Sequence, residues 1–110
     1  MITVLAVGDL VLEREDSWPL FEAAADTLAQ GDLVIGHLEI PHTVGGTVSV
    51  TDVPAIPGPP SALDGMARAG MDVVTLAGNH AFDFGARGLS DTIDACAQRG
   101  VLTVGGGDTL

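Results

Sequence analysis

Four residues with metal-binding or catalytic side chains follow the apolar runs of this sequence. Asp9, Glu39, Asn79 and His80 each lie within about three residues of the end of such a run. Binding sites in parallel sheets form outside the carboxyl ends of the strands, where these residues would meet. Carboxylate, amide and imidazole groups together suit Mn²⁺, Fe, Zn²⁺ or Mg²⁺ better than a metal ion that prefers thiolates. The four residues therefore predict a metal site at one edge of a sheet.

Each of these residues also has an ordinary interpretation when it is taken alone. Asp9 after Gly8 could form a turn that caps a helix, and Glu39 could be a solvated loop residue. Gly78 and Asn79 together are a common turn dipeptide. The combination favours a site, because two carboxylates ~4 Å apart would repel by about 4 kcal/mol at an effective dielectric constant near 20. A divalent ion between them reverses the sign of that energy.

The charge of the chain excludes several classes of partner. The 110 residues carry a formal net charge of −11, and the four basic residues are all arginines. Nucleic acids and anionic membranes bind to cationic surfaces, so neither is an expected partner. The acidity favours either simple solubility or the use of some carboxylates as metal ligands.

Cysteine usage and hydropathy give an expected environment for the chain. The single cysteine, Cys96, falls within an apolar helical pattern and is expected in the core. No signal peptide is visible after Met1, and no apolar run approaches the ~20 residues of a membrane span. We therefore expect a cytoplasmic chain, although a chain trimmed of its leader would look the same.

Apolar runs alternate with helix-type spacing along the chain. Strands are predicted at residues 2–7, 32–36, 71–77 and 101–104, and helices at residues 20–30, 61–69 and 88–99. The first run is almost continuously apolar, which predicts a strand buried on both faces. The alternation predicts an α/β fold, with a mostly parallel sheet flanked by helices and right-handed crossovers.

Residues 41–60 form a Pro- and Gly-rich insertion that holds five of the six prolines of the chain. A long insertion inside a compact domain is either a functional lid or binding loop, or a variable surface excursion. The sequence VGGT at residues 44–47 predicts a tight hairpin turn. His42 in this insertion and His37 before it have an ordinary interpretation as incidental loop histidines.

Several motifs resemble the CapA family of capsule and poly-γ-glutamate biosynthesis proteins. They are GDLVLER at residues 8–14, HLE at 37–39, PPSAL at 59–63 and GNHAFDFG at 78–85, with residues 70–77 and 104–107 also similar. The family belongs to the calcineurin-like metallophosphatase superfamily, whose domain is an αββα sandwich. The resemblance covers essentially the whole chain. It implies that residues 1–110 are the N-terminal half of such a domain and that the C-terminal half is absent.

The resemblance also implies roles for the candidate residues. Asp9, Glu39 and Asn79 would be ligands in a site that holds two divalent ions in the full domain. Two such ions can generate hydroxide and stabilise an in-line displacement. His80 would be catalytic, either stabilising the transferring phosphoryl group or protonating the leaving oxygen. Asp83 would orient His80 or would have only a structural role in the turn.

Three further positions are less determined by the resemblance. The family usually has Asn at the position of His37 and often has Asn at the position of Gly78. His37 therefore either adds a metal ligand or is neutral. Arg14 is a candidate cation for an anionic substrate.

The implied function is a role in capsule or poly-γ-glutamate biosynthesis, with metal-dependent hydrolysis of a phosphoester by the full-length protein. The alternative is a non-catalytic structural or polymer-binding component of a capsule synthesis or export complex. The expected partner is a phosphorylated or anionic polymer. The chain alone is expected to be inactive, and to be either marginally stable or oligomeric through the uncovered face of its sheet.

Overall fold

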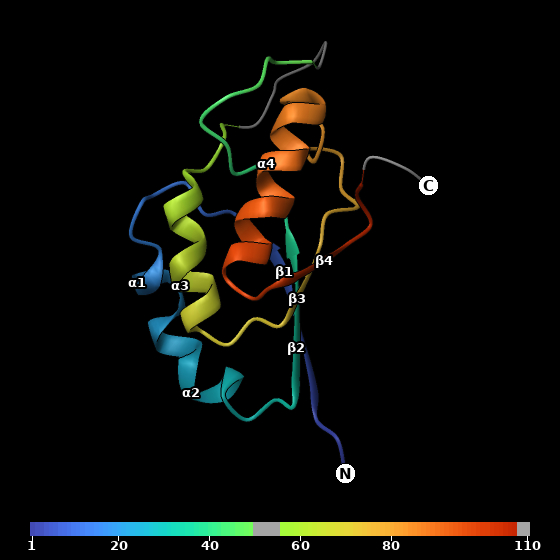
Figure 1. Cartoon of the computed structure of the whole chain (residues 1–110). Coiled ribbons are helices and arrows are strands. Elements are labelled where there is room, and N and C mark those ends of the chain that lie inside the picture. Colours follow the sequence, from blue (N-terminus) through green and yellow to red (C-terminus); the bar gives the residue numbers. More distant parts are fainter. Residues whose placement is uncertain (50–55, 108–110) are drawn as a thin grey trace.

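A four-stranded parallel sheet forms the centre of the computed structural model, which describes residues 1–49 and 56–107 (Figure 1). The strands lie in the order of the chain: β1 (Val4–Leu10), β2 (Leu33–Leu38), β3 (Val73–Thr75) and β4 (Leu102–Val104). Every neighbouring pair is parallel. The predicted α/β fold is therefore confirmed, although β3 is shorter than the predicted strand over 71–77.

Helical segments connect the strands. They are α1 (Trp18–Phe21), η1 (Glu22–Ala24), α2 (Ala25–Leu28), η2 (Pro60–Ala62), α3 (Leu63–Arg68) and α4 (Gly85–Gln98). The single helix predicted over 20–30 is wrong, because this segment is divided into three short pieces. Only Phe21 and Leu28 are buried in it. Since so short a helix is marginal without packing, the exposed residues between these two anchors do not hold a continuous α-helix.

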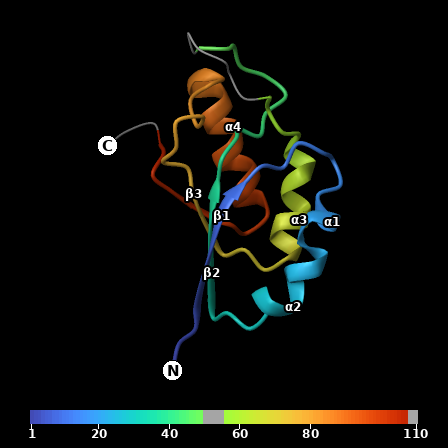
Figure 2. The same cartoon turned by 180° about the vertical axis from the view of Figure 1, so that it is seen from behind.

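All of the helices lie on one side of the sheet (Figures 1 and 2). This follows from the strand order, because right-handed crossovers between consecutive neighbours all pass over the same face. The prediction that the first strand is buried on both faces is consequently wrong. Burial alternates along β2, whereas the far face leaves Val4 53 % and Leu102 68 % exposed. We call this helix-free side the open face.

The core fills the space between the covered face of the sheet and the helices. Its fully enclosed members include Leu63 and Met66 of α3, Val74 of β3 and Cys96 of α4. Burial raises the pKa of the Cys96 thiol to about 11, so this thiol is neutral at physiological pH. Cys96 is thus a core residue, as predicted, and has no thiolate with which to react or bind a metal ion.

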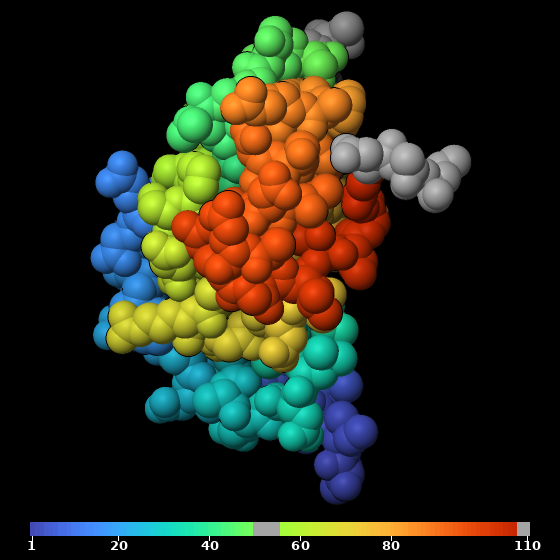
Figure 3. All heavy atoms as spheres, in the orientation of Figure 1, coloured from blue at the N-terminus to red at the C-terminus, as the bar shows by residue number. Residues whose placement is uncertain are grey.

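The described part of the insertion packs against the start of α4 (Figure 3). A parallel bridge joins His42 to Gly58, and the hydroxyl of Thr92 accepts a hydrogen bond from the His42 backbone N–H at 2.9 Å. The hairpin turn predicted at 44–47 is wrong, since residues 43–49 contain no strand. Instead the Ser49 N–H donates to the Asp83 carbonyl at 2.9 Å. Residues 50–55 lie outside the described residues.

We expect His42 to make the stability of the chain sensitive to acid. Its side chain is fully buried, its Nδ1 lies 3.1 Å from the Pro59 carbonyl oxygen, and its Nε2 has no partner among the described residues. Burial lowers the pKa of His42 below its ordinary value near 6.5, despite the opposing effect of the Pro59 hydrogen bond. The unfolded chain therefore takes up this proton at a higher pH than the folded chain.

We expect the free energy of unfolding to fall as the pH drops below about 6.5, through the range in which only the unfolded imidazole is protonated. Urea unfolding of the wild type and of His42→Leu at several pH values between 5 and 8 measures this. As the pH falls, the free energy of unfolding of the wild type should decrease relative to that of His42→Leu. A difference that does not change with pH would show that His42 makes no such contribution.

Candidate metal centre

Asp9, His37 and Glu39 meet at the carboxyl ends of β1 and β2. Each offers one ligand atom, and these atoms all lie within 4.8 Å of one another. Asp9 is exposed, whereas His37 and Glu39 are half-buried. A carboxylate–imidazole–carboxylate group of this size is suited to a divalent cation. We call these three residues the metal-type group.

A change of register between β1 and β2 aligns Asp9 with His37. Ala6 pairs with Ile35 but Asp9 pairs with His37, so β1 takes three steps where β2 takes two. Side chains alternate between the two faces along a strand. The extra residue in β1 therefore returns Asp9 to the open face, on which His37 also lies. With regular pairing, Asp9 would project toward the helices.

Hydrogen-bonding groups fix the ring of His37 at both nitrogens. Nδ1 lies 3.1 Å from the carbonyl oxygen of Thr75, its neighbour on β3, and Nε2 lies 3.0 Å from Oε2 of Glu39. A carbonyl oxygen can only accept, so Nδ1 carries a proton. In the neutral ring Nε2 then presents a lone pair to the Glu39 carboxylate. Two acceptors at this distance require a proton or a cation between them.

His80 and Asp83 form a second pair beside the metal-type group. Nδ1 of His80 lies 2.7 Å from Oδ2 of Asp83, and Nε2 lies 4.0 Å from Oε1 of Glu39. Asp83 is almost fully buried, and its hydrogen bond raises the pKa of His80 above the ordinary value. The geometry orients the imidazole so that Nε2 faces Glu39 and can carry an exchangeable proton.

The remaining two predicted residues, Asn79 and Arg14, lie in exposed segments after strands. Asn79 is exposed in the turn between β3 and α4, next to His80. Arg14 is exposed in the segment between β1 and α1, and within the described residues it has no hydrogen bond or ion pair. The sequence predicts either a metal ligand or a neutral residue at His37, and in the structure His37 lies in the metal-type group. Its spacing from Glu39 was the available signal, because residues i and i+2 of a strand share a face.

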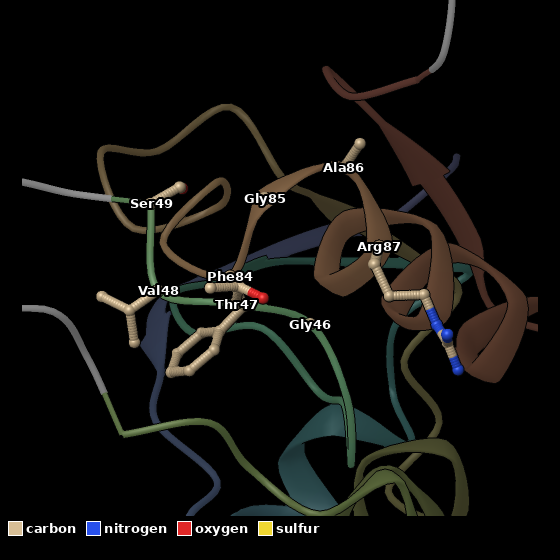
Figure 4. Close-up of a pocket in the computed structure, with 8 residues that line it drawn as sticks. All are labelled: Gly46, Thr47, Val48, Ser49, Phe84, Gly85, Ala86 and Arg87. Carbon is tan, nitrogen blue, oxygen red and sulfur yellow. The ribbon is translucent and has the colours of Figure 1, made fainter.

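A pocket of about 550 Å³ lies apart from the metal-type group, at the start of α4 (Figure 4). Its lining comes from two segments, residues 46–49 of the insertion and residues 84–87. Among the described residues of this lining, Arg87 is the only charged one, and it forms an ion pair with Asp91 at 3.0 Å. The described lining has no acid–base pair or group of metal ligands, so we place the candidate chemistry at the strand ends.

Comparison with known proteins gives one family. The family model described as "Bacterial capsule synthesis protein PGA_cap" matches residues 3–110. No curated protein matches the sequence. In the described part of the chain, none of the helices has the length and apolar character that crossing a membrane requires.

Proposed function

The chain belongs to the PGA_cap family of bacterial capsule synthesis proteins, and we propose that it serves capsule synthesis through a divalent metal centre that hydrolyses a phosphoester. Asp9, His37 and Glu39 would hold the ion, and His80 would act beside it. Asn79 stays a proposed additional ligand from the turn after β3. The substrate class that we propose is a phosphorylated or anionic polymer.

The contact between His37 and Glu39 is the observation that carries the proposal. Nε2 of His37 and Oε2 of Glu39 lie 3.0 Å apart, and Asp9 brings a further carboxylate to the same place. A separation of about 3 Å falls within the range that two ligand atoms of one divalent ion span, about 3 Å in octahedral and about 3.4 Å in tetrahedral sites. A divalent ion would also offset the mutual repulsion of Asp9 and Glu39. The residues therefore fit a divalent ion, and the second ion that the family resemblance implies stays a prediction.

In this proposal some residues bind the ion and others transfer a proton. When bound, the ion would stabilise negative charge on the phosphoryl oxygens. His80 would deliver a proton from Nε2 to the leaving oxygen, and Asp83 would keep Nδ1 protonated and the ring in place. The contact between Nδ1 of His80 and Oδ2 of Asp83 at 2.7 Å supports this role, because it holds the ring with Nε2 on the side of Glu39.

A second candidate function is a non-catalytic component of a capsule synthesis complex. The open face favours it, since Val4, Leu102 and Val104 are each at least half exposed there. Apolar patches of this kind mark contact surfaces. Metal binding without hydrolysis, together with self-association, would support this alternative over the first.

Hydrolysis of an aryl phosphate monoester and diester by the full-length protein, with added Mn²⁺ or Zn²⁺, tests the proposal. We expect His80→Ala to lower kcat by about 10²-fold or more, because general acid catalysis typically contributes 10²–10⁴-fold. Its metal affinity should be unchanged, because His80 is not in the metal-type group. Asp26→Asn, on exposed α2, serves as the control and should keep full activity. Activity that survives in His80→Ala would exclude the assigned role.

A further inference from the structure

We propose that His37 and Gly78 form a coupled pair that makes the metal centre selective for Zn²⁺-like transition ions over Mg²⁺. This inference rests on the proposed metal centre and adds its ion preference. It starts from an unusual closeness between two segments that are distant in sequence. An ideal Cβ on Gly78 would lie 2.6 Å from Nε2 of His37 and 2.7 Å from its Cε1.

The absence of a side chain at position 78 is explained by the His37 ring. The glycines with positive φ are Gly46, Gly70, Gly85, Gly100 and Gly105 among the described residues, so Gly78 is not needed for its backbone conformation. Apart from its two neighbours along the chain, only atoms of the His37 ring, among the described residues, come within contact distance of this Cβ. Any larger residue at 78 would therefore displace this imidazole.

The His37 ring, which fits beside Gly78, is oriented as a metal-binding imidazole would be. The Thr75 carbonyl holds Nδ1, which leaves Nε2 as the donor atom on the side of Glu39. Imidazoles that bind metal ions usually donate their other ring N–H to a carbonyl or carboxylate in this way. Thr75 and Gly78 thus act as positioning residues for His37, one through a hydrogen bond and the other through the space it leaves.

The ion preference follows from the chemistry of the three donor atoms. Mg²⁺ strongly prefers an all-oxygen, octahedral environment and keeps several of its waters. An imidazole nitrogen suits Zn²⁺, Fe²⁺, Co²⁺ or Ni²⁺, whose affinities for such a donor set exceed that of Mg²⁺. With Asp9 and Glu39 alone the group would offer only oxygens. The nitrogen of His37 therefore shifts the preference of the site toward the transition ions.

Metal-binding titrations of the purified full chain test the coupling without depending on activity. The variants are His37→Asn, Gly78→Ala and the double variant, and the ions are Zn²⁺, Co²⁺ and Mg²⁺. We expect each single variant to weaken Zn²⁺ binding by at least 10-fold and to change Mg²⁺ binding by less than about 3-fold. The visible absorption spectrum of bound Co²⁺ should change in His37→Asn, because a nitrogen ligand is lost.

The double variant should bind Zn²⁺ no more weakly than His37→Asn alone, because without the ring there is nothing for the alanine methyl group to displace. Gly45→Ala is the matched control, since the nearest atoms to its Cβ would be those of Arg87, at 3.6 Å or more. Thermal melts of the metal-free variants establish that each is folded. His37→Asn that binds Zn²⁺ as tightly as the wild type would overturn this inference and leave the metal centre intact. A wild type that binds none of the three ions would overturn the metal centre itself.

Discussion

Glu39→Gln is expected to abolish metal binding and all metal-dependent hydrolysis while leaving the metal-free chain folded. The substitution keeps the size of the side chain but removes the charge that faces both His37 and His80. A neutral amide cannot balance the positive charge of the ion as a carboxylate does. Asp9 would then be the only anionic residue left in the metal-type group. Because Glu39 lies at the end of β2 and is half-buried rather than in the core, its loss should cost the metal-free protein little stability.

Unfolding with and without the ion separates these two effects. A ligand at 100 times its Kd raises the free energy of unfolding by about 2.7 kcal/mol. The wild type should show an increase of this order with Zn²⁺, and Glu39→Gln should show almost none. Glu22→Gln, on an exposed helical segment, provides the matched control and should respond like the wild type. If Glu39→Gln instead destabilised the metal-free chain by more than about 2 kcal/mol, Glu39 would be a structural residue.

The second large effect is expected in the core at Leu63. This residue of α3 has no exposed surface and packs between the sheet and the other helices. Leu63→Ala should lower the free energy of unfolding by about 3–5 kcal/mol, because it removes buried methyl groups and leaves a cavity. Domains of this kind have total stabilities of about 5–15 kcal/mol, so the variant could lose most of its margin.

Urea unfolding monitored by circular dichroism measures this loss. Leu20→Ala is the matched control, since Leu20 is 51 % exposed on α1, and we expect it to cost less than about 1 kcal/mol. The slope of the unfolding free energy against urea should be the same in both variants. Equal losses in the two proteins would show that α3 is not anchored through Leu63 as the structure describes.

The sequence could predict where the chemistry lies but not how its parts are aligned. Apolar runs followed by Asp9, Glu39 and His80 identify strand ends, and parallel strands bring those ends to one edge. The alignment of Asp9 with His37 depends instead on one extra residue in β1. Strand periodicity carries no signal for such a bulge, because it appears only when the pairing register with β2 is known.

The number of sheet faces covered by helices could not be predicted from the sequence for a similar reason. An apolar run such as residues 2–7 is compatible with burial on both faces, and only the strand order decides how many faces the helices cover. The close approach of His37 and Gly78 could not be predicted either. Neither residue is unusual within its own segment, and the two are 41 positions apart in the sequence.

The strand order has a consequence for how the chain is made. Each strand pairs with the one synthesised just before it, so the sheet can grow from its first strand outward as the ribosome releases the chain. No strand has to wait for a later one to be inserted at its side. Asp9, His37 and Glu39 lie in the first pair of strands or directly after it, so all three residues are present once β2 has joined β1. The Thr75 carbonyl that orients the His37 ring arrives only with β3, so the metal-type group takes its final geometry when the third strand has paired.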